Sequence, residues 1–217
     1  MESITDFCKS ANITIHKTSE NLTAIQIEDL SSKVSRKKFH DYDAFVCFIL
    51  SHGEVGVICG VDGNTVEVER IVSGFRENPT LVGKPKLFFI QACRGRESDD
   101  GHRAEADSTA ALQETPVQEP VVLPENSDIL IAHSTYRGYE SYRYSDTGSL
   151  FIMKLIEQLK QHAHEKHLMD ILTLVNGEVS KCDIKLKNTV KKQTSCQMTS
   201  LSKFVYFNVP PPKSHGY

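Results

Sequence analysis

Residues 86–95 read KLFFIQACRG, and this stretch gives the strongest indication of the fold. Its first six residues form an apolar run of strand length, and Cys93 follows almost directly. Similar apolar runs occupy residues 44–50 and 129–133. Strands that are apolar throughout are typical of a sheet whose two faces are both covered. The sequence therefore predicts an α/β sandwich, with helices on both faces of one mostly parallel sheet.

Helical patterns alternate with these strands. Residues 23–39 begin with a capping box, in which Thr23 and Gln26 satisfy each other's backbone donors. Apolar residues recur at helical spacing in three further segments, 68–75, 149–162 and 168–179. Two more strands are predicted, at residues 12–17 from their alternation and at 203–209 from their aromatic and β-branched content.

The composition excludes several classes of protein. The 217 residues carry 25 basic and 28 acidic side chains, a net charge of −3, which excludes a globally basic nucleic-acid binder and gives no general reason to expect attraction to membranes. The longest apolar run falls far short of the ~20 residues of a membrane helix. Six cysteines without a CxxC pair favour reduced thiols over a disulfide scaffold or zinc knuckle. We expect a cytoplasmic protein without a metal or cofactor.

The middle of the chain differs from the rest. Residues 97–128 contain nine acidic side chains against one basic, together with Pro116, Pro120 and Pro124. Such a segment cannot bury enough apolar surface to offset its ordering entropy. It is predicted to be a flexible connection, which inside a compact domain usually serves function or processing. The alternative is a surface insertion that the fold merely tolerates.

Two reactive side chains follow neighbouring predicted strands. His52 comes just after residues 44–50, as Cys93 comes just after 86–91. If these strands are parallel neighbours, an imidazole lies near a thiol, accepts its proton and later protonates a leaving amine. The backbone N–H groups of Gly53 and Cys93 are candidates to stabilise an oxyanion. An isolated cysteine after a strand is more often inert and buried, but the matching histidine favours the catalytic interpretation.

The motif around the cysteine resembles that of a known family. Residues 91–95, Gln-Ala-Cys-Arg-Gly, match a signature of the caspases, whose histidine lies about 50 residues upstream and here lies 41 upstream. Further similar segments are 45–54, 83–88, 134–143 and 148–151, and the resemblance extends from about residue 4 to 209. It implies a three-layer caspase-like sandwich and a cysteine endopeptidase that cleaves proteins after aspartate in apoptotic proteolysis.

The resemblance also assigns a substrate site. Arg143 matches one of the family's specificity arginines and Gln91 matches the glutamine beside it, while His52 and Cys93 match the catalytic pair. A guanidinium offers the donor geometry that a carboxylate needs. Ser141 falls where relatives pair their main chain with the substrate. The next residue, Tyr142, falls where relatives form the wall of the second subsite. Without this context, Arg143 would read as a solvated loop residue.

Processing and assembly follow from the same resemblance. Relatives are cut after an aspartate, and the sequence AEAD ending at Asp107 offers such a site, with Asp100 as the alternative. Cleavage there converts a zymogen into a large subunit, 1–107, and a small subunit, 108–217. We expect a homodimer of these pairs in which residues 203–209 meet their twin across a two-fold axis. The resemblance also implies regulation by upstream caspases or by inhibitor-of-apoptosis type proteins.

The chain departs from the family pattern in three respects. Relatives carry, before the region that matches Ile4, a core strand and a loop that supplies a second specificity arginine and a carbonyl that orients the histidine. Residues 12–17 would pair with that strand, so we expect them to be detached or rearranged, and the chain to be less stable and active than a restored form. There is no tryptophan, and residues 136–137 are Tyr-Arg where relatives have a residue followed by proline.

These departures keep other functions open. The first is a truncated, non-catalytic partner that dimerises with full-length caspases and modulates them; the absent strand favours it, whereas the retained Cys93 and His52 favour the enzyme. The second is a metacaspase-like protease that cleaves after basic residues. It needs acidic side chains in the first subsite, and Arg143 argues against it.

Overall fold

The computed structural model describes residues 2–99, 124–144, 148–186, 189–207 and 209–210. Both candidate processing sites, Asp100 and Asp107, lie outside the described residues, as does the boundary proposed between the subunits. The helices are α1 (Glu2–Ser10), α2 (Ala24–Ser35), α3 (Val68–Arg76), α4 (Leu150–His162) and α5 (Leu168–Lys181), with a short 3₁₀ turn at Pro79–Leu81. The four helices predicted from periodicity are therefore confirmed, each within a few residues.

One four-stranded sheet forms the centre of the fold. Its strands are β1 (Phe45–Leu50), β5 (Lys86–Gln91), β6 (Ile129–His133) and β11 (Cys196–Thr199), in the order β1-β5-β6-β11. The first three run parallel, and β11 pairs antiparallel with β6. The predictions for residues 86–91 and 129–133 coincide with β5 and β6. The predicted strand 44–50 begins one residue before β1 does.

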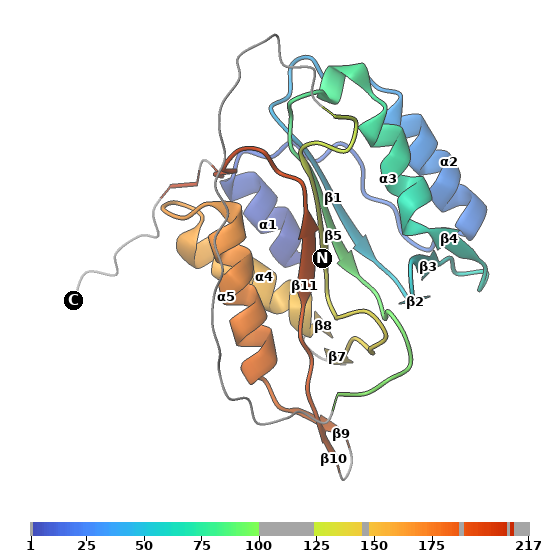
Figure 1. Cartoon of the computed structure of the whole chain (residues 1–217), viewed down its shortest axis with the longest axis vertical. Coiled ribbons are helices and arrows are strands. Elements are labelled where there is room, and N and C mark those ends of the chain that lie inside the picture. Colours follow the sequence, from blue (N-terminus) through green and yellow to red (C-terminus); the bar gives the residue numbers. More distant parts are fainter. Residues whose placement is uncertain (1, 100–123, 145–147, 187–188, 208, 211–217) are drawn as a thin grey trace.

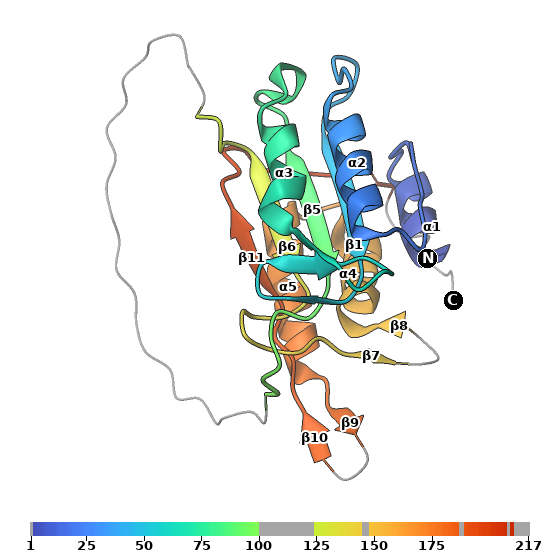
Figure 2. The same ribbon diagram turned by 90° about the vertical axis from the view of Figure 1, so that its right-hand side faces the viewer.

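Helices cover both faces of this sheet, as the sequence predicts. Helices α1, α4 and α5 lie on one face and α2 and α3 on the other (Figure 1 and Figure 2). Successive residues of β5 alternate between the two cores: Leu87 and Phe89 pack with α4 and α5, whereas Phe88 and Ile90 pack with α3. Because both faces are buried, the four interior residues of β5 are apolar, and the polar side chains of Lys86 and Gln91 at its ends make hydrogen bonds.

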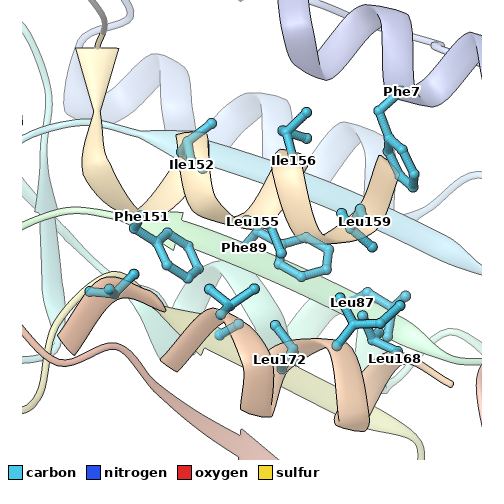
Figure 3. Close-up of a cluster of buried hydrophobic side chains, with 14 of the residues drawn as sticks. Phe7, Leu87, Phe89, Phe151, Ile152, Leu155, Ile156, Leu159, Leu168 and Leu172 are labelled. Atoms are coloured by element: carbon cyan, nitrogen blue, oxygen red, sulfur yellow. The ribbon is translucent and has the colours of Figure 1, made fainter. Parts of the chain in front are cut away.

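The core under α4 and α5 is the larger of the two. Phe89 and Leu87 of β5 lie between the two helices, with Phe151 and Leu155 of α4 and Leu172 of α5 around them (Figure 3). These side chains are at most 1% exposed. Helix α4 begins at the residue after Ser149, so this core fixes the position of the segment that enters it.

The capping box of α2 is present as predicted. Thr23 Oγ1 accepts a hydrogen bond from the Gln26 backbone at 3.3 Å, and Gln26 Oε1 accepts one from the Thr23 backbone at 2.9 Å. The helix ends at Ser35, however, rather than at residue 39. Asn78 Nδ2 donates to the carbonyls of Ser35 and Lys37 at 2.6 and 2.7 Å, so a side chain takes the carbonyls that a further helical turn would have used.

The strand predicted at residues 12–17 is wrong. Helix α1 is followed by a left-handed residue, Asn12 (φ 53°), and the Ile13 N–H caps the helix by donating to Cys8 O at 2.7 Å. The chain then continues without ladder hydrogen bonds. The alternation of Ile13 and Ile15 is a strand pattern, but a strand forms only where a neighbouring strand supplies partners.

The strand predicted at residues 203–209 is also wrong for the described residues 203–207 and 209. Val205 O accepts a hydrogen bond from Leu168 N at 2.7 Å, and the Phe207 ring packs edge-on against Phe7 at 5.5 Å. The segment therefore packs on the helical layer instead of extending the sheet. One edge of the described sheet is β11, a polar stretch that sequence patterning did not reveal; the other edge is β1.

Three small sheets complete the described structure. They are β2 (Gly53–Glu54), β3 (Val57–Cys59) and β4 (Thr65–Glu67); β7 (Arg143–Tyr144) with β8 (Gly148–Ser149); and β9 (Ile184–Leu186) with β10 (Thr189–Lys191). The first two lie near the carboxyl ends of the parallel strands (Figure 2). Within the described part of the chain, no helix has the length and apolar character needed to cross a membrane.

Candidate active site

The register of two parallel strands brings the predicted histidine and cysteine to one edge of the sheet. Leu50 of β1 pairs with Gln91 of β5, and Ser51 N donates to Gln91 O at 2.9 Å. His52 and Cys93 each stand two residues beyond this pair. Both therefore lie at the carboxyl ends of neighbouring strands, where α/β folds place their reactive groups. Cys93 is half-buried and His52 is exposed.

Gly53 forms the contact between the two loops. A Cβ atom at this position would lie 2.5 Å from Val57 O, 3.1 Å from the Ala92 Cβ and 3.2 Å from Cys93 O. No side chain fits in this space, so only glycine allows β2 to pass against the backbone of the cysteine loop. The backbone of Gly53 thus lies beside Cys93, as a shared oxyanion site requires.

A third loop closes over the cysteine. Ser141 N donates to Cys93 Sγ at 3.4 Å, and the thiol lies 3.6 Å from Ser141 O. One residue further, Arg94 N donates to Tyr139 O at 3.0 Å and Arg94 O accepts from Gly138 N at 2.7 Å. The predicted substrate loop and the cysteine loop are therefore joined by main-chain hydrogen bonds.

A second glycine permits this close approach. A Cβ on Gly95 would lie 2.0 Å from Gly138 O, closer than any real side chain can stand. Glu97 N also donates to Gly138 O at 3.1 Å, so the two loops stay paired beyond the glycine.

The predicted specificity glutamine is buried and held from both sides. Gln91 Nε2 donates to Ser141 Oγ at 2.7 Å, and the hydroxyl of Ser149 donates to Gln91 Oε1. Gln91 and Ser149 are only 7% and 6% exposed. Gln91 comes from the sheet, Ser141 from the substrate loop and Ser149 from the start of α4, so three separate segments converge on this amide.

Arg143 is paired in a β-ribbon with Ser149, one of the residues that hold Gln91. It belongs to β7 and pairs with Ser149 of β8, and directly opposed residues of an antiparallel pair share one face of the ribbon. Its side chain is exposed. Tyr142, by contrast, is half-buried against the core under α4 and α5, and its N–H donates to Gln193 Oε1 at 2.9 Å.

Two polar side chains that support the site were not predicted in that role. Ser134 Oγ accepts from Ala92 N at 3.3 Å and donates to Ala92 O at 3.0 Å, so it clamps the residue before Cys93. Gln193 Nε2 donates to Ser134 O at 2.6 Å while its oxygen holds Tyr142. Ser134 stands inside the motif at 134–143 and could have been found there. Gln193 stands alone in a polar segment and gives no signal.

The electrostatics beside the cysteine loop depend on Arg94. Its Nη1 donates to Cys196 Sγ at 3.3 Å. His133 pairs directly with Cys196 across β6 and β11. Burial, assisted by the charge of Arg94, lowers the pKa of His133 from 6.5 to about 4, so this imidazole is neutral near pH 7. On the other side of the site, burial raises the pKa of the Cys59 thiol, and Glu54 and Cys93 raise it further.

The imidazole of His52 has no hydrogen-bond partner within the described ranges. In the same ranges, no three histidine, cysteine or acidic side chains are grouped as metal ligands would be. A cavity of about 660 Å³ lies between α2 and α3; Ser31, Ser35 and Gly74 are among its lining residues, whereas His52 and Cys93 are not. The reactive residues therefore line a surface formed by loops, not this cavity.

The chain is similar in sequence to proteins of a known family. The family model described as the caspase domain matches residues 1–206. Caspase-3 of Bos taurus is 41% identical over 196 residues, which cover 86% of this chain and 68% of that protein. Caspase-3 of Oryctolagus cuniculus and of Mus musculus are 39% and 41% identical over 199 residues, which cover 88% of this chain and 69% of each relative. The family model covers nearly the whole chain, and the chain belongs to the caspase family.

Proposed function

We propose that this chain is a cysteine endopeptidase that cleaves proteins after aspartate, with Cys93 as nucleophile and His52 as general base and acid. The observation that carries the proposal is the β1–β5 register, which brings both residues to the same edge of the sheet with the Gly53 backbone against Cys93. Membership of the caspase family supports a cysteine protease of apoptosis-type proteolysis.

The chemistry follows from these positions. His52 takes the thiol proton of Cys93, and the thiolate attacks the carbonyl carbon of the scissile bond. The N–H groups of Gly53 and Cys93 stabilise the oxyanion of the tetrahedral intermediate. As that intermediate collapses, the imidazolium gives its proton to the leaving amine and a thioester remains on Cys93. Water, deprotonated by His52, then releases the carboxylic acid and restores the thiol.

Specificity for aspartate would come from Arg143 and Gln91. The guanidinium supplies the charge and the fork of donors that a carboxylate needs, and the amide of Gln91 adds a neutral donor. This assignment is supported by the hydrogen bonds of Ser141 to both Gln91 and Cys93, which join the candidate carboxylate site to the nucleophile. Ser141 is proposed to pair with the substrate main chain and Tyr142 to wall the next subsite.

Processing into two subunits and dimerisation are also part of the proposal. Cleavage after Asp107 would give subunits 1–107 and 108–217, and upstream caspases would be the activating proteases. For dimerisation, the described sheet ends at β11, and Met198 on this strand is 62% exposed. An open edge of this kind is usually covered or paired, so β11 replaces residues 203–209 as the strand expected to meet its twin across a two-fold axis.

Two observations favour the alternative of a non-catalytic partner that modulates full-length caspases. Strand β1 pairs on one side only among the described residues, and all six of its residues remain at least partly exposed. The exposed imidazole of His52 also lacks a side chain or carbonyl to orient it within the described ranges. A misoriented base would lower turnover without preventing dimerisation.

Peptide cleavage distinguishes the two functions. The purified chain is assayed with a peptide that contains one aspartate and with the matched asparagine peptide, which keeps the shape but removes the charge. The enzyme is expected to prefer aspartate by several orders of magnitude. Cys93→Ala should abolish this activity, whereas Cys182→Ala, at a half-buried cysteine of the α5 end, should retain it. An unprocessed chain that dimerises with a full-length caspase but never cleaves would establish the alternative.

A further inference from the structure

Ser149 makes two different hydrogen bonds in a buried position. Its Oγ accepts from Ile152 N at 3.2 Å and so caps the N-terminus of α4. Its hydroxyl proton goes to Gln91 Oε1. Ser149 is 6% exposed, which leaves water little access to either bond. The cap fixes where the hydroxyl stands, because the helix that it begins is anchored in the core.

The donors and acceptors of this group define one orientation of the Gln91 amide. A serine hydroxyl has one proton to donate, and a glutamine amide has an oxygen that accepts and a nitrogen that donates twice. If the amide were reversed, its nitrogen would face Ser149 and the hydroxyl proton would lose its acceptor. Buried donors without acceptors are strongly disfavoured. The hydroxyl of Ser149 therefore selects the orientation in which Gln91 Nε2 faces Ser141.

This orientation leaves a donor available on the side of the substrate loop. One Nε2 proton goes to Ser141 Oγ at 2.7 Å, and the second has no acceptor among the described residues. The backbone N–H of Ser141 also donates to Cys93 Sγ, so the residue that accepts the Gln91 N–H is in contact with the candidate nucleophile. Ser149 is in addition the cross-strand partner of Arg143. One serine thus adjoins both candidate carboxylate-binding side chains.

We propose that Ser149 is a positioning residue for substrate recognition: its hydroxyl holds the Gln91 amide with the N–H donors toward the substrate aspartate. The effect on substrate recognition rests on the proposed function, whereas the orientation of the Gln91 amide does not. Without this hydroxyl the amide can present its oxygen to the pocket, and that oxygen would repel a carboxylate.

Three substitutions separate this role from simple helix capping. Ser149→Thr keeps the acceptor and the proton. Ser149→Asp keeps the capping acceptor, which aspartate provides well, but has no proton to donate and should draw the Gln91 nitrogen toward itself. Ser149→Ala removes both groups. Thr23→Ala is the matched control, because it removes the hydroxyl cap of α2 on the opposite face of the sheet.

The first measurement needs no activity. In protein with ¹⁵N-labelled glutamine, the Gln91 amide protons should show nuclear Overhauser contacts to the Ser141 β-protons in the wild type, in Ser149→Thr and in Thr23→Ala. Ser149→Asp should lose these contacts. Their retention in a folded Ser149→Asp protein would overturn the proposal, as would contacts to Ser149 in place of Ser141 in the wild type.

The second measurement is cleavage of the aspartate peptide. Ser149→Asp and Ser149→Ala should lose about tenfold or more in kcat/KM, mainly through a raised KM, because the carboxylate loses a donor. Ser149→Thr and Thr23→Ala should stay within about threefold of the wild type. A loss confined to kcat, or an equal loss in Thr23→Ala, would assign Ser149 a purely structural role. If the wild type cleaves no aspartyl peptide, the proposed function fails, and the amide contacts still decide the role of Ser149.

Discussion

His133 should make the stability of this protein depend on pH in a narrow range. It occupies the last position of β6, between Ile90 of β5 and Cys196 of β11. Burial and the charge of Arg94 lower its pKa from 6.5 to about 4. A substitution to glutamine, which cannot become charged, tests whether this half-buried imidazole destabilises the fold in mild acid.

The sign and size of the effect follow from linkage. Because the folded pKa lies below the unfolded value, the unfolded chain binds a proton more readily, so stability is complete above pH 6.5 and falls as pH decreases toward 4. At about 1.4 kcal/mol per pKa unit, the shift corresponds to about 3 kcal/mol at most. Between pH 7 and pH 4.5 the wild type should lose about 2 kcal/mol from this group, a large share of a typical stability of about 5–15 kcal/mol.

Urea unfolding at pH 7.0, 5.5 and 4.5 measures this loss for the wild type and for His133→Gln. The quantity of interest is the change in unfolding free energy with pH, because the substitution itself can shift the absolute value. His133→Gln should lose about 2 kcal/mol less than the wild type over this range. His40→Gln, at an exposed histidine, is the control and should follow the wild type. Parallel pH curves for the wild type and His133→Gln would refute the argument.

Further substitutions test the packing of the site and its thiols. Gly53→Ala should destabilise the fold and abolish turnover, because its Cβ would lie 2.5 Å from a backbone oxygen; Gly177→Ala, with nothing within 4 Å, should leave the melting temperature equal or higher. Thr23→Ala should cost about 1 kcal/mol in urea unfolding, and no loss would mean that the capping box contributes nothing. Iodoacetamide at pH 7 should modify Cys93 well before Cys47, whose pKa burial raises to about 12, and equal rates in mass mapping would contradict this.

The parts of the fold that the sequence predicted are those set by local patterns. Strand β5 was predicted to the residue because its interior is an apolar run of strand length, and the start of α2 because Thr23 and Gln26 form a capping box. The positions of His52 and Cys93, each just after a predicted strand, could also be read from local motifs; that the two strands are parallel neighbours is shown by the structure. These features depend on neighbours in sequence.

The incorrect predictions concern segments whose structure depends on distant partners. Residues 12–17 have a strand-like alternation but no strand beside them, and residues 203–207 have strand-like composition but pack on α1 and α5. The reverse holds for β11, whose polar residues form a strand because β6 offers them hydrogen bonds. Propensity alone cannot separate these cases, since a strand is stabilised by the contacts across it.

The two halves of the candidate site therefore differ in how the chain specifies them. The nucleophile and base need only the register of β1 against β5, which two short motifs encode. The carboxylate site needs Gln91 from the sheet, Ser141 from a loop and Ser149 from a helix start, 58 residues away from Gln91 in sequence. Because each of these side chains is satisfied by another of them, a change at any one leaves a buried polar group without its partner. Substitutions in this group should consequently alter the choice of substrate before they alter the chemistry at Cys93.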